Sequence, residues 1–510
     1  MKGQTSKWLY PAALVLVGMI AFGYIFNEKI DLNGDNCVYY GNATSIVTGY
    51  GYSDILHNPT TNYPPGYPLL MAPIRMLTDS VVAQKLLNGL FLIGGVLLLY
   101  FILTAAGAKR SLAFVAGCAA LLTPRLLSFS TMMMAEASCF GFAALALFFL
   151  TKIKDYDHFW KDYWFYLMAF ALIYCYHIRT QGIVLAGSVI VWLFIIRKWK
   201  AGLGTLVLFF IGCLPWIIRN KMLGLNQSRY LDQIMGANLW RPEEGTLTIG
   251  GVIDRFFDTL KMLITQAIPS AINPFFNVDF TVKPGAGLWV VGLVMFALML
   301  YGFWKLGRYR WIFIFYFLGT LAMVSLSNTP SEDRYIITIM PWLTAGLFVG
   351  MWALLSLLLK SLSVQRDFPP LLLALMLLFS FGGLKDLHKA NKQPFPPNYQ
   401  NFFALGTVIK KNLPPQTVVC SRKPELLYVY AGTMGVRYMH TSNDTLLIKD
   451  LVKQKVDYVI LEQLGYSSTG LYLYPAIQKN MELFQVASQV KDPDTYLLYF
   501  DRKKAQEKYR

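Results

Sequence analysis

The chain has 510 residues, of which 55% are hydrophobic and 15% are charged, and its formal net charge is +17. Together with a mean hydropathy of +0.43, this composition excludes an ordinary soluble globular protein and is typical of a polytopic membrane protein. In that class an excess of Lys and Arg marks cytoplasmic loops and lipid headgroup contacts. We therefore expect membrane lipids, and no nucleic acid, among the partners.

Long apolar stretches predict the membrane spans. A helix needs about 17 to 25 apolar residues to cross a bilayer, and the sequence has eleven candidates. They cover residues 8–27, 79–106, 112–128, 136–151, 163–178, 183–196, 202–218, 287–304, 311–326, 336–359 and 369–384. No small-residue cleavage site follows the first stretch, so we expect an uncleaved anchor there.

The charges between the spans predict their orientation. Fifteen Lys and Arg residues lie in six segments that alternate with the remaining connections. The positive-inside rule places these six segments in the cytoplasm. The other connections then lie outside, and they include residues 28–78, residues 219–286 and everything after residue 385. Eleven spans place the two ends of the chain on opposite sides.

The first outer loop, residues 28–78, has an unusual composition. Its stretch from Asp35 to Pro68 carries two acidic residues, six tyrosines and a rigid Pro-Pro-Gly turn. A carboxylate within hydrogen-bond reach of a substrate can accept a proton. This loop is therefore the strongest candidate for chemistry at the membrane surface.

The second long outer segment, residues 219–286, contains an amphipathic stretch. In GVIDRFFDTLKMLITQAIP the apolar residues recur at helical spacing, with charged residues set between them. Such a helix is expected to lie in the membrane interface. A core helix of a small outer subdomain fits the same pattern.

Strands and helices alternate after residue 384. TVVCS, VDYVILE and TYLLYF predict strands, and PELLYVYAG, TLLIKDLVKQK and PAIQKNMELF predict helices. The chain thus divides into a transmembrane catalytic domain, residues 1–384, and a small extracytoplasmic α/β domain, residues 385–510. The second domain has no nucleotide-binding loop and no G-x-S-x-G elbow, so we expect an accessory role for it.

Five ionisable residues near the outer ends of the spans are candidate functional groups: Asp35, Glu136, Arg179, Arg219 and Arg334. Charge at a membrane is costly unless it is paired or lines a watery cavity. Plainer alternatives exist, since the arginines can contact lipid phosphates and Glu136 can stabilise the start of its helix. Asp35 can belong to the turn NGDN. Their joint occurrence on one side favours a functional site.

Several short motifs then occur in a recognisable order. They are D-x-x-x-Y (Asp35, Tyr39), Y-P-P-G-Y-P (Tyr63 to Pro68), A-E-A (Glu136), R-x-x-G (Arg179, Gly182), P-W-x-x-R-N (Pro215 to Asn220) and D-R-Y before x5-P (Arg334, Tyr335, Pro341). With them the chain resembles the GT-C glycosyltransferases over residues 8–384. The branch it resembles most contains the protein O-mannosyltransferases and the bacterial lipid A aminoarabinose transferases. The α/β tail is also similar to that of many bacterial members.

The resemblance implies a reaction. A hexosyl or pentosyl group moves, with inversion, from a polyprenyl-phosphate-linked donor to an envelope glycan, lipid or protein acceptor. The reaction takes place on the outer face of a bacterial inner (plasma) membrane. In this scheme Asp35 is the catalytic base, and Arg179, Arg219 and Arg334 stabilise the departing phosphate.

The resemblance also implies the remaining substrate contacts. Tyr39, Tyr63 and Tyr67 offer ring faces and hydroxyls to a sugar, and Tyr335 follows the last arginine. Glu136 orients the acceptor or, together with Asp35, binds a divalent cation. The scattered histidines and cysteines predict no dedicated metal site, so the two carboxylates suit either a hard cation or none.

One departure from the family concerns the donor. In the aminoarabinose transferases a charged residue typically precedes the Pro-Pro pair, whereas this chain has Asn62 and Tyr63 there. This difference argues against an aminosugar. Two other functions stay open: a transporter or flippase of lipid-linked saccharides, and a membrane scaffold without catalysis. The two halves share no repeat, and the ionisable groups lie at one interface, which favours the transferase.

Overall fold

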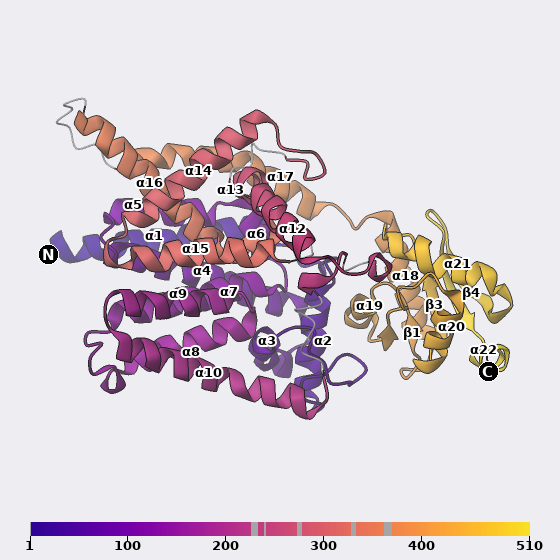
Figure 1. The fold of residues 1–510 in the computed structure, drawn as a ribbon. Coiled ribbons are helices and arrows are strands. Elements are labelled where there is room, and N and C mark those ends of the chain that lie inside the picture. Colours follow the sequence, from indigo (N-terminus) through magenta and orange to yellow (C-terminus); the bar gives the residue numbers. More distant parts are fainter. Residues whose placement is uncertain are drawn as a thin grey trace.

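The computed structural model describes residues 2–225, 233–238, 241–272, 278–327, 333–361 and 370–509. It has two parts, a helical bundle and a smaller α/β part beyond one end of the bundle (Figure 1). The N-terminus lies at the far end of the bundle, and the C-terminus lies in the α/β part.

The bundle consists of long apolar helices. They are α1 (Lys2–Ile25), α4 (Val81–Ala105), α5 (Arg110–Leu121), α6 (Pro124–Ser130), α7 (Ala135–Lys152), α8 (Tyr163–Ile178), α9 (Gly182–Ile195), α10 (Trp199–Met222), α14 (Ala286–Trp304), α15 (Arg310–Ser325), η5 (Arg334–Ile339) with α16 (Met340–Ser361), and η6 (Pro370–Phe379) with α17 (Ser380–Lys392). Among the described residues, seven helices are long and apolar enough to span a membrane, or eight if the bent pair α5 and α6 is one span. Helices α8 and α9 are apolar but shorter. The polytopic helical architecture is therefore present, while the count of eleven includes stretches shorter than a full span.

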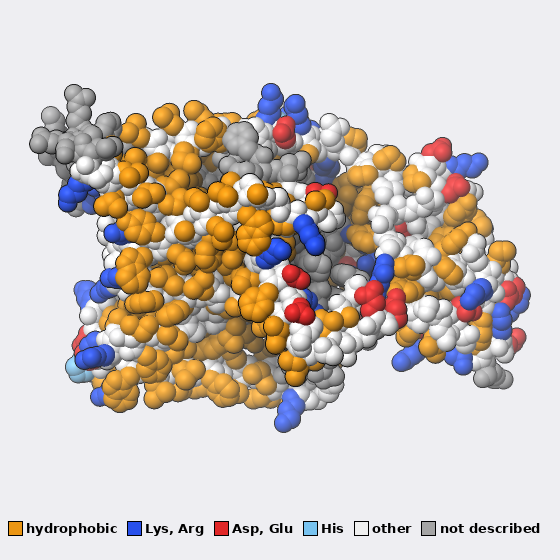
Figure 2. All heavy atoms as spheres, turned by 45° about the horizontal axis from the view of Figure 1, so that its top comes forward, with side chains coloured by type: hydrophobic (Ala, Val, Ile, Leu, Met, Phe, Trp, Pro, Cys, Tyr) orange, Lys and Arg blue, Asp and Glu red, His pale blue; other side chains and the backbone are white. Residues whose placement is uncertain are grey.

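The outer surface of the bundle is apolar. Figure 2 shows hydrophobic side chains over most of the bundle face and charged side chains mainly near its ends and on the α/β part. Phe210 and Ile211 on α10 and Val290 on α14 are more than half exposed. A soluble monomer rarely exposes so large an apolar surface, whereas lipid acyl chains cover it without cost.

The predicted span 112–128 is broken. Helix α5 ends at Leu121, α6 begins at Pro124, and the two helices meet at an angle of 63°. The reason is local, because proline lacks a backbone N–H and disfavours helical geometry in the residue before it. Thr123 is accordingly extended. The break directs Arg125 toward the end of the bundle that carries the α/β part.

The first outer loop contains two helices, α2 (Asp35–Val47) and α3 (Gly66–Leu77), which we did not predict from the sequence. Helix α2 begins directly after Gly34, whose φ of +104° favours glycine. Helix α3 begins after the Pro-Pro pair, which is compatible with a first helical turn. The many turn-forming residues conceal both helices from a pattern-based prediction. The two helices pack on each other, and α2 packs on the α/β part.

The second outer segment forms η2 (Pro242–Glu244), α12 (Ile249–Met262), η3 (Leu263–Ala267) and α13 (Ile268–Ile272). The amphipathic helix α12 exposes Ile249, Ile253 and Phe257 at helical spacing. It packs against α15. Its position in a membrane interface stays a prediction.

The α/β part comprises α18 (Pro397–Asn412), β1 (Val419–Cys420), α19 (Pro424–Ala431), β2 (Gly435–Val436), α20 (Asp444–Lys453), β3 (Tyr458–Leu461), η7 (Thr469–Leu473), α21 (Tyr474–Lys479), η8 (Met481–Leu483), β4 (Phe484–Val490), β5 (Thr495–Phe500) and α22 (Arg502–Lys508). The strand order is β2-β1-β3-β5-β4, with β2, β1 and β3 parallel and β5 antiparallel to both neighbours. The three predicted strands are β1, β3 and β5. Strand β2 is only two residues long, and β4 has mostly exposed or half-buried side chains and a bulge, so neither shows a clear alternation.

Candidate functional site

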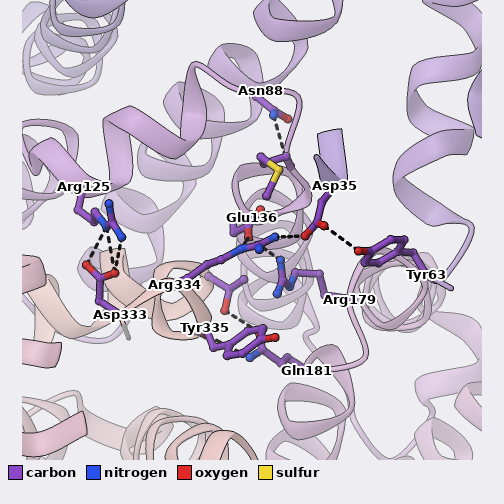
Figure 3. Close-up of polar contacts among 12 residues, drawn as sticks. Asp35, Tyr63, Asn88, Arg125, Glu136, Arg179, Gln181, Asp333, Arg334 and Tyr335 are labelled. Carbon is purple, nitrogen blue, oxygen red and sulfur yellow. Dashed lines mark hydrogen bonds and ion pairs between the residues drawn. The ribbon is translucent and has the colours of Figure 1, made fainter. Parts of the chain in front are cut away.

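Four charged side chains meet beside the start of α2 (Figure 3). Asp35 is the first residue of α2, and Glu136 lies in the first turn of α7. Arg179 follows the end of α8, and Arg334 opens η5. We call these four residues the charged cluster. Asp35 and Arg334 are 299 positions apart in the sequence, so only the fold brings them together.

Arg334 connects the two carboxylates. Its Nη2 donates to Asp35 Oδ2 over 2.5 Å, and its Nε donates to Glu136 Oε1 over 3.3 Å. Arg179 Nη1 donates to the same Glu136 oxygen over 2.6 Å. Two guanidinium groups therefore balance two carboxylates, and the cluster has no net formal charge.

The two carboxylates differ in exposure. The side chain of Glu136 is fully buried, whereas that of Asp35 is 26% exposed. Burial raises the pKa of Asp35, but the charge of Arg334 and hydrogen bonds from Arg334 and Tyr63 outweigh it and hold this pKa below its usual value. These contacts favour the ionised form of Asp35, and its side chain stays partly exposed.

The predicted tyrosines form a group of contacting rings beside Asp35. The Tyr63 hydroxyl donates to Asp35 Oδ1 over 2.8 Å. The Tyr39 ring lies 4.9 Å from that of Tyr63 and meets the Tyr67 ring edge-on at 5.0 Å. Tyr39 and Tyr67 are buried, and Asn88 Nδ2 donates to the Tyr67 hydroxyl over 3.0 Å. Tyr63 contacts the carboxylate, and Tyr67 supports this group from the interior.

Arg219 lies apart from the charged cluster. Its guanidinium donates to the carbonyl oxygens of Tyr52, over 2.6 Å, and Thr60, over 3.1 Å. It also lies 4.9 Å from the ring centre of Trp216. These contacts hold the first outer loop to the end of α10. The structure therefore places Arg219 neither beside the cluster, as a role on the departing phosphate predicted, nor toward lipid, as the alternative predicted.

Tyr335 lies beside the cluster. The guanidinium of Arg179 is 5.8 Å from the centre of its ring, within the range of a cation–π contact. Gln181 Nε2 donates to the Tyr335 carbonyl over 3.1 Å, and Thr338 donates to Oε1 of the same glutamine. The segment after α8 is thereby attached to η5.

Sequence reasoning missed an ion pair that fixes Arg334. Arg125 donates to both carboxylate oxygens of Asp333, with distances of 2.7 Å from Nη2 to Oδ1 and 2.8 Å from Nε to Oδ2. Such bidentate pairs define orientation as well as energy. The position of Asp333 next to Arg334 was the available signal. Asn88 was also missed, although an amide inside an apolar span is itself a sign of a specific contact.

The cluster as it stands does not fit a divalent cation. Arg334 occupies the space between Asp35 and Glu136, and a second arginine contacts Glu136. Within the described part of the chain, no three His, Cys, Asp or Glu side chains form a group that could hold a metal ion by themselves. The arrangement suits guanidinium groups instead.

Comparisons with known proteins decide the fold. No protein-family model and no curated protein matches this sequence. Among solved structures, apo ArnT from Cupriavidus metallidurans matches with a TM-score of 0.61 and 12% identity, over 97% of this chain and 98% of that chain. The archaeal oligosaccharyltransferase AglB from Archaeoglobus fulgidus matches with a TM-score of 0.55 and 11% identity, over 89% and 69%. Both are GT-C proteins. This chain has a GT-C fold.

The predicted GT-C architecture is thus confirmed, and at these identities the likeness concerns the fold. Two of the matching structures contain a lipid carrier. ArnT bound to undecaprenyl phosphate matches with a TM-score of 0.59, 12% identity and coverage of 97% and 98%. AglB was solved with an inhibitory peptide and a dolichol-phosphate.

Proposed function

We propose that this protein is a membrane glycosyltransferase that transfers a sugar from a polyprenyl-phosphate-linked donor to an acceptor on the extracytoplasmic side. The main support is a partly exposed, ionised Asp35 that is paired with Arg334 at one end of a GT-C bundle. The polyprenyl phosphates in the ArnT and AglB structures support the choice of donor class.

The proposed reaction is a single displacement with inversion. Asp35 accepts the proton of an acceptor hydroxyl while that oxygen attacks the anomeric carbon of the sugar. The bond from this carbon to the phosphate oxygen breaks on the opposite face, and the electron pair leaves with the polyprenyl phosphate. Arg334, with Arg179 beside it, stabilises the negative charge that develops there.

Neutrality of the charged cluster couples donor binding to activation of the base. All of its positive charge is matched by carboxylates, so we propose that a donor phosphate competes with Asp35 for Arg334. The contact that lowers the pKa of Asp35 is then lost. Asp35 consequently becomes a stronger base once the donor is bound.

The remaining parts of the proposal concern the surroundings of this reaction. Residues 1–384 carry the chemistry, and residues 385–510 form an outer domain above it, in a bacterial inner membrane. The acceptor is an envelope glycan, lipid or protein. The ring and hydroxyl of Tyr63 face Asp35 where a charged residue stands in the aminoarabinose transferases, so we propose a neutral hexosyl or pentosyl donor. Arg219 contributes by holding the loop that carries these residues.

Asp35→Asn tests the proposal directly. The amide keeps the size of the side chain but cannot accept the proton, so sugar transfer should fall by about 100-fold to 10,000-fold. Transfer is measured with purified protein in vesicles that contain a polyprenyl-phosphate sugar. Asp79→Asn is the matched control, because Asp79 is 89% exposed and paired with Arg75 outside the cluster.

Two outcomes contradict the proposal. Unchanged transfer by Asp35→Asn removes Asp35 as the base. Movement of the intact lipid-linked sugar across the vesicle membrane, without transfer by the wild type, supports a flippase instead.

A further inference from the structure

The turn that precedes Asp35, residues 31–34, is held by two buried lysines from opposite sides. From the bundle, Lys85 Nζ on α4 donates to the Lys29 carbonyl over 2.8 Å and to Asp31 Oδ1 over 3.2 Å. The side chain of Lys85 is fully buried, and that of Asp31 is 7% exposed. The other oxygen of Asp31 accepts from the Met133 N–H over 3.2 Å. The start of the turn is therefore anchored to the bundle.

From the α/β part, Lys423 holds the end of the same turn. Its Nζ donates to the carbonyl of Leu32 and, over 3.3 Å, to that of Asn33. Lys423 is 5% exposed, and its ammonium lies 5.2 Å from the ring centre of Tyr466. A buried ammonium is costly unless its donors are satisfied. The two carbonyl groups satisfy two of its three donors.

The chain between these lysines and Asp35 has little freedom. The Gly34 N–H donates to Asn36 Oδ1 over 2.8 Å, and Asn36 Nδ2 donates back to the Asp31 carbonyl over 2.9 Å. Asp35 follows as the first residue of α2. A displacement of Asn33 is therefore passed directly to the catalytic carboxylate.

The same contact continues into a shared core. Lys423 immediately precedes α19, and α19 packs along α2. Cys37, one turn into α2, is fully buried in a cluster whose other members include Phe402, Leu426 and Leu427 of the α/β part. The helix that carries Asp35 thus contributes a buried side chain to a core of the α/β part.

We propose that Lys423 is a positioning residue, and that through it the outer domain sets the location of Asp35. The domain is then a working part of the active site instead of an accessory. The structural half of this proposal, that Lys423 holds α2, is independent of the reaction. The kinetic half rests on the proposed function.

Lys423→Met removes the two hydrogen bonds and keeps the apolar stem. The turn then loses its outer support, and Asp35 moves relative to Arg334 and Tyr63. A misplacement of about 1 Å can lower a rate by about 100-fold. We expect kcat to fall by that order, while KM for the donor does not rise, because Arg179 keeps its ion pair with Glu136 and a displaced Asp35 competes less for Arg334.

Site-resolved labelling of Cys37 supplies the structural readout. A water-soluble maleimide is applied to the full-length protein in detergent, and the modified cysteines are identified by peptide mass spectrometry. In Lys423→Met we expect Cys37 to be labelled about ten times faster than in the wild type, since exposure follows local opening. Cys139 and Cys175, buried in the bundle, should keep their wild-type protection.

Three further variants complete the test. Lys423→Arg retains a charged donor and should restore most of the activity and the protection of Cys37. Lys479→Met removes an exposed lysine that pairs with Asp444 on the far helices of the same domain and should change neither readout. If Lys423→Met does not fold, Lys423→Gln replaces it, and we expect an intermediate loss of both.

The outcomes separate the two proposals. Wild-type labelling of Cys37 and wild-type kcat in Lys423→Met overturn the positioning role. A fall in kcat with unchanged Cys37 protection, or one that Lys423→Arg does not restore, also overturns it. Faster labelling of Cys37 in a protein whose wild type transfers no sugar supports the docking role and refutes the glycosyltransferase.

Discussion

Two sets of buried charges lie near the same end of the bundle, and they differ in how completely they are satisfied. In the Lys85–Asp31 pair the ammonium has three oxygen acceptors, and the second carboxylate oxygen accepts from a backbone N–H. In the charged cluster Asp35 is 26% exposed, and Arg334 is 21% exposed. Within the described chain, Glu136 Oε2 is buried and has no hydrogen-bond partner.

The difference separates structure from chemistry. A closed pair with all its groups satisfied fixes a fold and offers nothing to a ligand. A cluster with exposed charges and an acceptor without a hydrogen bond can still bind a substrate. Binding of a substrate would also explain why the cluster contains a buried oxygen without a partner. This criterion supports our proposal that the charged cluster is the functional site and that the Lys85–Asp31 pair has a structural role beside it.

Apart from Asp35→Asn, the largest effect on the reaction is expected from Arg334→Met. In the proposed reaction this change removes the group that stabilises the leaving phosphate, so kcat/KM should fall by about 1,000-fold. Stability should change less, because Asp35 is partly exposed and Glu136 keeps Arg179. Steady-state transfer and thermal unfolding are measured on the same preparation. Arg75→Met, which breaks the ion pair with Asp79 outside the cluster, is the control. Equal losses in both variants contradict the special role of Arg334.

Lys85→Met is expected to lower stability more than it lowers the rate of the reaction. Removal of one partner from a buried pair leaves the charge of Asp31 uncompensated, at a cost of about 3 to 5 kcal/mol in the free energy of unfolding. The midpoint of thermal unfolding should fall clearly, and Lys85→Met/Asp31→Asn should regain part of the loss. A midpoint equal to that of the wild type would remove the structural role of this pair.

The smallest effect concerns the pH profile. Asp35 must be ionised to act as a base, so activity is lost as pH falls through its pKa. That pKa lies below the usual value of Asp, about 4. In Tyr63→Phe the carboxylate loses a hydrogen bond, its pKa rises, and the acid limb of kcat/KM should move to higher pH by less than about one unit. An acid limb that stays in place or moves to lower pH contradicts the proposal that the hydrogen bond from Tyr63 lowers the pKa of Asp35.

Much of the fold follows from short-range patterns. Apolar stretches long enough for a span predict helices whatever their neighbours are, and every predicted stretch overlaps helical segments, although 112–128 is divided between α5 and α6. Counting spans also predicts that Asp35, Glu136 and Arg334 lie near the ends of spans on the same side. The two helices α2 and α3 were missed, because turn-forming residues dominate their sequences and their stability comes from packing on each other and on the bundle.

The site was only partly accessible to the same reasoning. Arg179, Arg219 and Arg334 have equivalent positions in the sequence, each at the outer end of a span. The structure places two of them on Glu136 and the third on the carbonyl groups of Tyr52 and Thr60. Nothing in the local sequence of the three arginines predicts which partner each one contacts, because a guanidinium pairs with whatever acceptor lies within about 3 Å.

The sequence by itself determined that this protein is a helical membrane protein with a polar outer end and an α/β tail, because hydropathy and its period are local properties of the chain. The tertiary structure decided which charges meet and which are closed off. It also joined Lys423 to the turn before Asp35, across 390 and 391 positions of sequence. Contacts of that kind depend on distances in space that local patterns do not encode.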